Sequence, residues 1–247
     1  MGLSLCGTMK RQFSIISILI FIIANSLSGQ SLSGTTGYFN IPSADLQADK
    51  TVYFGFNRAN KKYQDYADGE YDINIFYGAI TFLEFLELGL RYSRLDGFDP
   101  PGRKQAGDRM ATARIRPLKQ GKYHPAVLIG FQNFFTTLDG GSAAHFNSSY
   151  IVVTKDFEIR RLIKSIGVSI GYGSDVLRSA DYQFIGLFGG IRIVPQHLDF
   201  LELMFEYDAD KWNVGARVTV LKHVKILAGF EGLDSFSGGI AYQFMLP

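Results

Sequence analysis

The chain has 247 residues, a formal net charge of +2 at neutral pH and a single cysteine, Cys6. This length corresponds to one large domain or two small ones, and the near balance of charge excludes the basic patch that nucleic-acid binding requires. Because Cys6 precedes an apolar N-terminal stretch, the rest of the chain has no disulfide or thiolate chemistry available. The 27 glycines, 21 phenylalanines and 13 tyrosines are typical of an all-β barrel or sandwich with many short strands.

The N-terminus has the pattern of an export signal. Lys10 and Arg11 precede an apolar run from Phe13 to Ala24, and small and polar residues follow it. A run of about a dozen residues suits the apolar region of a signal peptide and is shorter than the roughly 20 residues of a membrane-spanning helix. We therefore predict a cleaved signal peptide over residues 1–30; the alternative is a retained membrane anchor.

Residues 31–50 form a segment that precedes the first predicted strand. Gly34, Gly37 and Pro42 interrupt it, which argues against regular secondary structure. From residue 51 to residue 247, by contrast, apolar and polar residues alternate with a period of two, as in half-buried antiparallel strands. The strands predicted from this alternation cover residues 51–57, 71–80, 86–93, 108–116, 125–134, 148–155, 166–173, 184–194, 201–208, 212–220, 224–230 and 236–244.

The clearest pair of strands lies between residues 201 and 220. Two alternating runs flank a short polar turn, which predicts a β-hairpin. With a two-residue loop at positions 209 and 210, Glu202 faces Arg217 and Glu206 faces Asn213 across the ladder.

The apolar face of these strands points either into a core or into lipid. The polar face is rich in glycine, serine, threonine and asparagine, whereas a solvated exterior carries more lysine and glutamate. Twelve strands with long connections on one rim and mostly short turns on the other are typical of an outer-membrane barrel. We therefore predict an antiparallel transmembrane β-barrel of about 12 strands in the bacterial outer membrane, with residues 31–50 as a plug or a periplasmic arm. The alternative is a soluble β-sandwich or lipocalin-like barrel with the apolar face as its core.

The polar positions of the strands supply the candidate site residues. In the second strand we assign Ile73, Ile75 and Tyr77 to the outer face and their polar neighbours to the lumen. In a narrow barrel, opposite charges at these positions either stabilise the wall by forming ion pairs or contact a sugar. The lumen-facing candidates are Asp72, Asn74, Glu87, Arg91, Arg114, Arg116, Arg192, Glu202, Glu206 and Arg217.

Several short motifs follow one another along residues 34–208. They are Gly34-x-x-Gly37-x-x-x-x-Pro42-Ser43-Ala44, Phe85-Leu86-Glu87-Leu88-Gly89-Leu90-Arg91-Tyr92, and the stretches 125–131, 149–155, 187–190 and 206–208. In this order they resemble the YjbH-like family of bacterial exopolysaccharide and capsule proteins. The resemblance implies an outer-membrane barrel that helps to secrete or organise a polymer, with membrane lipid, polysaccharide and other polysaccharide-assembly proteins as partners. Because longer relatives carry additional domains, the resemblance does not imply a complete export channel here.

Motifs for catalysis are weak. The stretch from Gly167 to Gly171 matches Gly-x-Ser-x-Gly, but that motif needs a strand, a sharp turn and a helix, and Ser169 lies in the middle of a predicted strand. Glu202 and Glu206 share one strand face. A glycosidase needs two carboxylates on either side of a sugar bond, whereas glutamate and arginine in a lumen more often form a charge ladder that fills the barrel.

The four histidines lack ligand spacing, so we predict no metal and no cofactor. We expect a non-catalytic protein; the alternatives are an outer-membrane barrel enzyme acting on lipid or polysaccharide and a soluble secreted sugar-binding β-protein.

Overall fold

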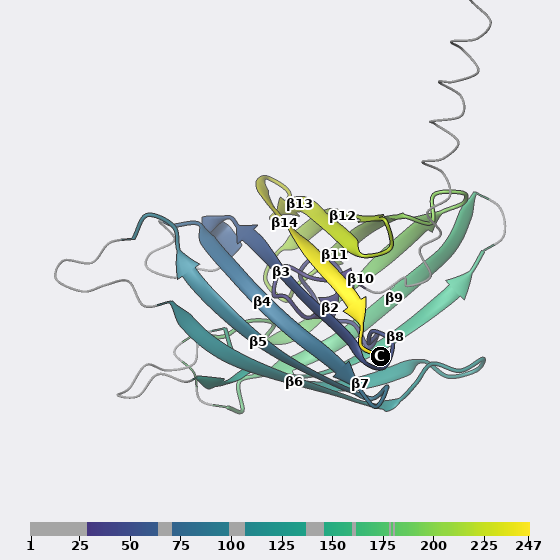
Figure 1. Ribbon diagram of the computed structural model, residues 1–247, viewed down its shortest axis with the longest axis horizontal. Helices are drawn as coiled ribbons and strands as arrows, with labels where there is room; N and C mark the ends of the chain where they lie inside the picture. The colour runs from purple at the N-terminus through teal and green to yellow at the C-terminus, as the bar shows by residue number, and fades with distance from the viewer. Residues whose placement is uncertain are drawn as a thin grey trace, which may run out of the picture.

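Twelve antiparallel strands close into a barrel in the computed structural model (Figure 1). The structure describes residues 29–63, 71–98, 107–136, 146–159, 162–177, 179 and 181–247. Each barrel strand pairs with its neighbours in the sequence. The strands are β3 (Thr51–Ala59), β4 (Ile73–Phe82), β5 (Leu86–Leu95), β6 (Asp108–Leu118), β7 (Ala126–Thr136), β8 (Ser148–Glu158), β9 (Ile163–Ser174), β10 (Gly186–Pro195), β11 (Leu201–Tyr207), β12 (Trp212–Val220), β13 (Val224–Glu231) and β14 (Ser235–Met245). The predicted all-β, twelve-stranded antiparallel barrel is therefore confirmed.

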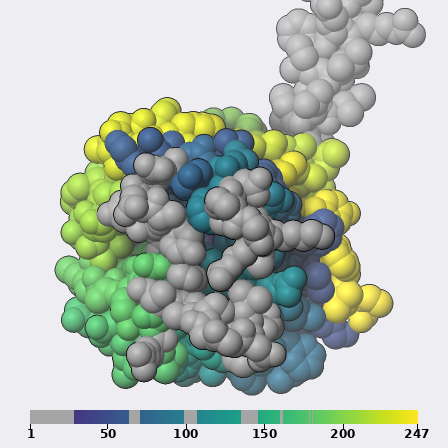
Figure 2. Space-filling model, turned by 90° about the vertical axis from the view of Figure 1, so that its left-hand side faces the viewer, coloured from purple at the N-terminus to yellow at the C-terminus, as the bar shows by residue number. Residues whose placement is uncertain are grey.

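The barrel closes where the last strand meets the first. β14 pairs antiparallel with β3, with Tyr242 opposite Phe54 and Phe244 opposite Val52. In the end-on view of Figure 2, yellow C-terminal residues accordingly lie beside purple and blue residues from the start of the barrel. Closure leaves no strand edge with unpaired backbone groups.

The hairpin between β11 and β12 has the predicted register. Glu202 lies opposite Arg217, and Glu206 lies opposite Asn213. Ala209 has a positive φ of 77° in the turn that joins the two strands. Because side chains alternate along both strands, this register directs both glutamates to the same side of the wall.

The wall is apolar outside, and inside it carries charged and polar side chains beside an apolar cluster that includes Leu128, Val152 and Phe188. Leu90, Ile170, Leu187 and Phe236, on four different strands, expose 69%, 57%, 64% and 63% of their surfaces. Arginine and glutamate side chains, by contrast, are buried in the interior. The exposed apolar exterior and the buried charges distinguish this wall from that of a soluble barrel, whose apolar side chains face the centre.

β4 departs from the predicted alternation. Ile73, Ile75 and Tyr77 are buried and point inward, while Asn74 and Phe76 lie on the outer face. The inward face packs on other interior groups; the ring of Tyr77, for example, lies 6.4 Å from that of Tyr53.

Asp72 lies just before β4, at the rim, where Arg58 pairs with its carboxylate at 3.1 Å. The assignment of Asp72 and Asn74 to the lumen is therefore wrong. The reason is that both faces of β4 are largely apolar here, so the alternation alone did not tell inside from outside.

Residues 29–47 fill the lumen, and we call this segment the plug. β1 (Gly29–Gln30) and β2 (Thr36–Gly37) pair as a small antiparallel ladder, and β2 is visible inside the barrel in Figure 1. Almost all of the plug is buried. Of the two predicted roles for residues 31–50, the structure has the plug. Gly29 and Gln30, which the sequence analysis assigned to the signal peptide, belong to it, and residues 1–28 lie outside the described residues.

The barrel has two unlike ends. At the short-turn end, tight connections follow β4, β10 and β12, and the C-terminus lies beside Lys50. At the long-connection end lie the connections that follow β3, β5, β7 and β9. The only helix among the described residues is the 3₁₀ turn η1 (Lys61–Tyr63), which lies at this end. No helix in the described part of the chain is long and apolar enough to cross a bilayer.

Candidate functional site

The first ion pair of the lumen joins β5 to β6. Arg114 Nη1 lies 2.6 Å from Glu87 Oε1, and both side chains are at most 1% exposed. Arg114 Nε also donates to the hydroxyl of Tyr150 at 3.0 Å, and its Nη2 donates to the backbone carbonyl of Ser43 in the plug. Glu87 accepts from the hydroxyl of Thr36 at 2.5 Å. The pair therefore fastens two points of the plug to the wall.

The second ion pair joins β11 to β12. Arg217 Nη1 donates to Glu202 Oε2 at 2.8 Å. Its Nη2 donates to three plug carbonyls, those of Gln30, Gly37 and Tyr38, at 3.1, 2.7 and 2.8 Å. One guanidinium thus holds both strands of the small plug ladder, and the charge of Glu202 compensates it.

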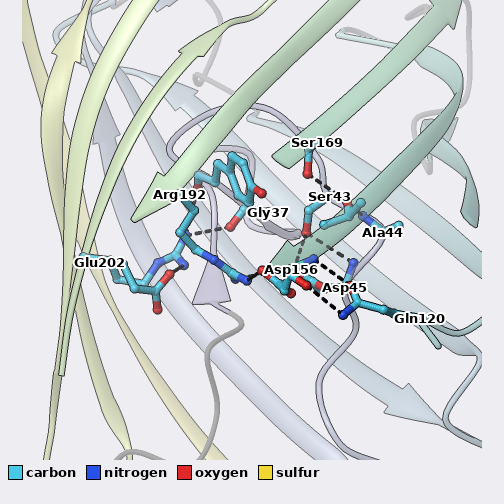
Figure 3. Close-up of polar contacts among 12 residues, drawn as sticks. Gly37, Ser43, Ala44, Asp45, Gln120, Asp156, Ser169, Arg192 and Glu202 are labelled. Carbon is cyan, nitrogen blue, oxygen red and sulfur yellow. Dashed lines mark hydrogen bonds and ion pairs between the residues drawn. The ribbon is translucent and has the colours of Figure 1, made fainter. Parts of the chain in front are cut away.

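Arg192 on β10 is the centre of a third cluster, which Figure 3 shows in close-up. Its Nη2 donates to Asp156 Oδ1 at 2.7 Å, and its Nη1 lies 3.4 Å from Asp45 Oδ2 of the plug. The guanidinium carbon also lies 5.5 Å from the ring centroid of Tyr38. Burial raises the pKa of the Tyr38 phenol above its ordinary value, so this ring stays neutral beside the ion pairs.

Glu206 binds the plug through backbone amides. Its carboxylate accepts from the N–H groups of Phe39, Asn40 and Ile41 at 3.1, 2.7 and 3.2 Å. Successive N–H groups that converge on one carboxylate form charge-assisted hydrogen bonds, which are stronger than neutral ones. The side-chain amide of Asn40 donates in turn to Asp208 at 2.8 Å.

Two of the predicted candidates lie apart from these clusters. Arg116 lies at the short-turn rim, where its Nη2 donates to the carbonyl of Glu84 at 2.7 Å. Arg91 is buried in the half of the lumen toward the long-connection end, and its guanidinium carbon lies 5.1 Å from the ring centroid of Phe146. Its Nε and Nη1 have no hydrogen-bond partner in the described structure.

The structure therefore sorts the sequence candidates by location. Asp72 and Asn74 lie outside the lumen, Arg116 lies at its rim, and Arg91 lies inside but away from the ion pairs. The candidates that come together around the plug are Glu87, Arg114, Arg192, Glu202, Glu206 and Arg217.

Sequence reasoning missed several residues that hold the plug. Asn57 donates its side-chain amide to the carbonyls of Ser31 and Leu32 at 3.0 and 2.9 Å. Thr154 accepts from the backbone amide of Ala44 at 2.7 Å. Both residues occupy inward positions of their strands, so alternation could have found them. Asp45 lies in the irregular plug, where no period gives its direction.

The Gly-x-Ser-x-Gly stretch has no nucleophile-elbow geometry. Ser169 lies within β9, and its hydroxyl lies 2.7 Å from that of Thr154. Among the described residues, no group of three or more histidine, cysteine, aspartate or glutamate side chains is placed to hold a metal ion.

Fold and site together define a class: a closed twelve-stranded β-barrel whose lumen is filled by its own N-terminal segment and lined by buried ion pairs. The family model of the exopolysaccharide biosynthesis protein YbjH matches residues 29–245. The chain therefore belongs to this YjbH family, as the motifs in the sequence indicated. The match begins with the plug and ends at the last residue of β14. No curated protein matches the chain.

Proposed function

We propose that the protein is a plugged barrel of the bacterial outer membrane that takes part in the export or surface assembly of an exopolysaccharide, without catalysing a reaction. The family supports a role connected with exopolysaccharide. The membrane setting, the export role and the absence of catalysis are the steps we add.

The observation that carries the proposal is the apolar outer wall. Large apolar side chains on opposite parts of the barrel are more than half exposed, among them Leu90 on β5 and Leu187 on β10. Monomeric soluble proteins rarely expose apolar surface over a wide area. In a bilayer the same side chains face acyl chains, and a closed barrel satisfies every backbone group of the wall. The soluble sugar-binding alternative leaves this surface in water.

The orientation follows from the two ends. Outer-membrane barrels have short turns on the periplasmic side and longer connections outside the cell. The short-turn end, with the C-terminus, then faces the periplasm. The ion pairs of Arg192 with Asp45 and Asp156 lie near this end.

A plugged lumen gives the protein a closed resting state. The ion pairs fasten the plug at several points, so an export path through the lumen requires the plug to move. If the plug stays in place, the protein acts in surface assembly instead.

The non-catalytic part of the proposal rests on how the acidic residues are used. Glu202 is paired with Arg217, and Glu206 is occupied by plug amides. Neither carboxylate is available to protonate a leaving group or activate water. We expect the unchanged protein to hydrolyse neither lipid nor polysaccharide, so substituting Ser169, Glu202 or Glu206 should change nothing in a hydrolysis assay. If the unchanged protein hydrolyses one of them and a folded variant does not, the barrel-enzyme alternative is favoured.

The test begins with fractionation and gel mobility with and without boiling. We expect recovery in the outer membrane and a mobility shift on heating, because a closed barrel resists detergent until it is heated. Deleting the gene should lower the amount of polymer at the cell surface, and the full chain should restore it. Recovery from the periplasm without detergent, or unchanged polymer after deletion, would overturn the proposal.

A further inference from the structure

We infer that a cavity at the long-connection end binds pyranose units of a neutral or amino-sugar polysaccharide. This inference rests on the proposed function, because it names the kind of polymer that the barrel handles. The cavity has a volume of about 540 Å³, which lies within the roughly 300–1,000 Å³ of small-molecule sites. Its lining comes from η1, from the residues just before β8 and β10, and from the turn between β11 and β12.

The floor of the cavity is aromatic and closely packed. Tyr63 and Phe146 meet edge to face with ring centroids 6.3 Å apart, and both rings are almost wholly buried. Phe184 packs on Phe188 of the wall at 5.8 Å. Rings held in this way provide a preformed surface, so a ligand does not have to order them when it binds.

Tyr182 supplies an open aromatic face. Its side chain is 39% exposed, although its hydroxyl accepts a hydrogen bond from the Ser179 amide at 3.3 Å. Its backbone is fixed as well, because Tyr182 forms a parallel bridge with Asn147. An exposed but immobilised ring can stack on the apolar face of a pyranose at little cost in side-chain entropy.

The polar groups of the cavity suit hydroxyl and amino groups. Three carboxylates, those of Asp181, Asp208 and Asp210, line it together with one ammonium group, that of Lys211. Asp210 has an 80% exposed side chain, and its Oδ2 forms an ion pair with Lys211 Nζ at 2.9 Å. Carboxylates accept hydrogen bonds from sugar hydroxyls and attract a protonated amine. The same charges repel a uronate, sulfate or phosphate group, so the lining selects against an acidic polymer.

The cavity is joined to the plug through Asn40. The side-chain amide of this residue donates to Asp208 at 2.8 Å and its oxygen accepts from Gln183 at 3.4 Å. Gln183 is also held by Gln132, whose amide donates to it at 2.7 Å. A sugar in the cavity therefore touches residues that bind the plug directly.

The experiment is calorimetric titration of the purified full chain in detergent with four hexasaccharides. They consist of glucosamine, N-acetylglucosamine, glucose and galacturonic acid. We expect binding of at least one of the first three and no binding of the galacturonate. Tyr182→Ala should lower the affinity for that ligand at least tenfold. Asp210→Asn should lower the affinity for the glucosamine hexasaccharide more than that for a neutral one.

Tyr123→Ala is the matched control, because Tyr123 is an even more exposed tyrosine in the connection that follows β6 at the short-turn end. It should bind as the unchanged protein does. The heat-dependent mobility shift shows that each variant is folded. Hydrogen exchange gives a second readout, since the bound ligand should slow exchange at residues 38–41.

Three results would overturn the inference: no binding by any of the four ligands, preference for the galacturonate, or equal loss in the two tyrosine variants. These results leave the proposed function standing if the protein still fractionates with the outer membrane and supports surface polymer. If the protein binds a sugar but is not recovered in the outer membrane, the proposed membrane barrel is overturned and the sugar site stands.

Discussion

The two halves of the lumen treat charge differently. In the half toward the short-turn end, the described residues include three buried arginines that pair with carboxylates: Arg114 with Glu87, Arg217 with Glu202, and Arg192 with Asp156. In the half toward the long-connection end, the one buried arginine that the structure describes, Arg91, has no carboxylate within ion-pair distance in the described structure. Three buried carboxylates in that half, those of Glu206, Asp208 and Glu231, accept hydrogen bonds from plug amides, side-chain amides and a serine hydroxyl.

The difference teaches what each half is built to do. A buried charge is costly unless it is paired and hydrogen-bonded. The short-turn half meets that condition through contacts to the plug backbone, so it fixes the plug in one position. In the other half, Gln132 and Asn133 hold the carbonyl of Phe146 at 3.2 and 3.0 Å, and the cavity lies beside this amide network. We conclude that ion pairs hold the plug in the short-turn half, whereas hydrogen bonds to Glu206 and Asp208 hold it in the other half, where the cavity lies.

The largest expected effect comes from removing a paired arginine. Arg114→Met leaves Glu87 buried without its partner and removes the bond to Ser43. We expect the free energy of unfolding to fall by about 3–5 kcal/mol. Urea unfolding in detergent, followed by the fluorescence of Trp212, the single tryptophan, measures it.

The matched control is Arg91→Met, which makes the same substitution in the other half. Since Arg91 is buried without a carboxylate partner among the described residues, the change should be neutral or stabilising. The double variant Glu87→Gln with Arg114→Met should recover part of the loss, because no buried charge is then left alone. Equal losses for Arg114→Met and Arg91→Met would contradict the division of the lumen into two halves.

The wall of the barrel could be read from the sequence almost completely. The hairpin of β11 and β12 has the predicted register, because its alternation is regular and its turn is short. The same alternation correctly placed Glu87 and Arg114 inside, opposite each other in neighbouring strands. Alternation works in these strands because one of their faces is apolar and the other carries the charged residues.

The lumen contents could not be read in the same way. The plug has no period, so nothing local indicated that Arg217 and Glu206 bind its backbone. β4 failed for a related reason: Tyr77 packs against Gly34 of the plug, where a Cβ at position 34 would come within 2.5 Å of the ring. An inward apolar face needs a partner in the lumen, and the sequence does not show that partner.

A smaller effect is expected where the wall meets the plug without charge. A Cβ at Gly215 would lie 2.5 Å from the ring of Phe39 and meets no backbone atom among its nearest neighbours. Gly215→Leu overfills this contact and should lower the free energy of unfolding by about 1–3 kcal/mol. Urea unfolding measures the loss, and faster hydrogen exchange at residues 38–41 should accompany it because the plug loosens.

Two variants separate this clash from a general effect of replacing glycine in a strand. Phe39→Ala added to Gly215→Leu should restore part of the stability by making room for the leucine. Gly78→Ala should be almost neutral, because its Cβ would meet its nearest neighbours at 3.6 and 3.8 Å, which is ordinary contact. A loss for Gly78→Ala as large as that for Gly215→Leu would mean that the plug contact is not the cause.

The smallest effect is expected at the exposed edge of the long-connection end. Lys62 Nζ lies 2.6 Å from Asp234 Oδ2, and this hydrogen bond holds the pKa of the Asp234 carboxyl below its ordinary value. Because the folded-state pKa is lowered, the pair contributes stability above the ordinary pKa and loses it as the pH falls through the lowered value. The Asp234→Asn variant should therefore unfold at a slightly lower urea concentration than the unchanged protein at neutral pH. In acid the two proteins should unfold at the same urea concentration. Since both side chains are exposed, salt should shrink the difference at neutral pH as well. A difference that survives both acid and salt would mean that the charge of Asp234 is not the cause of the effect.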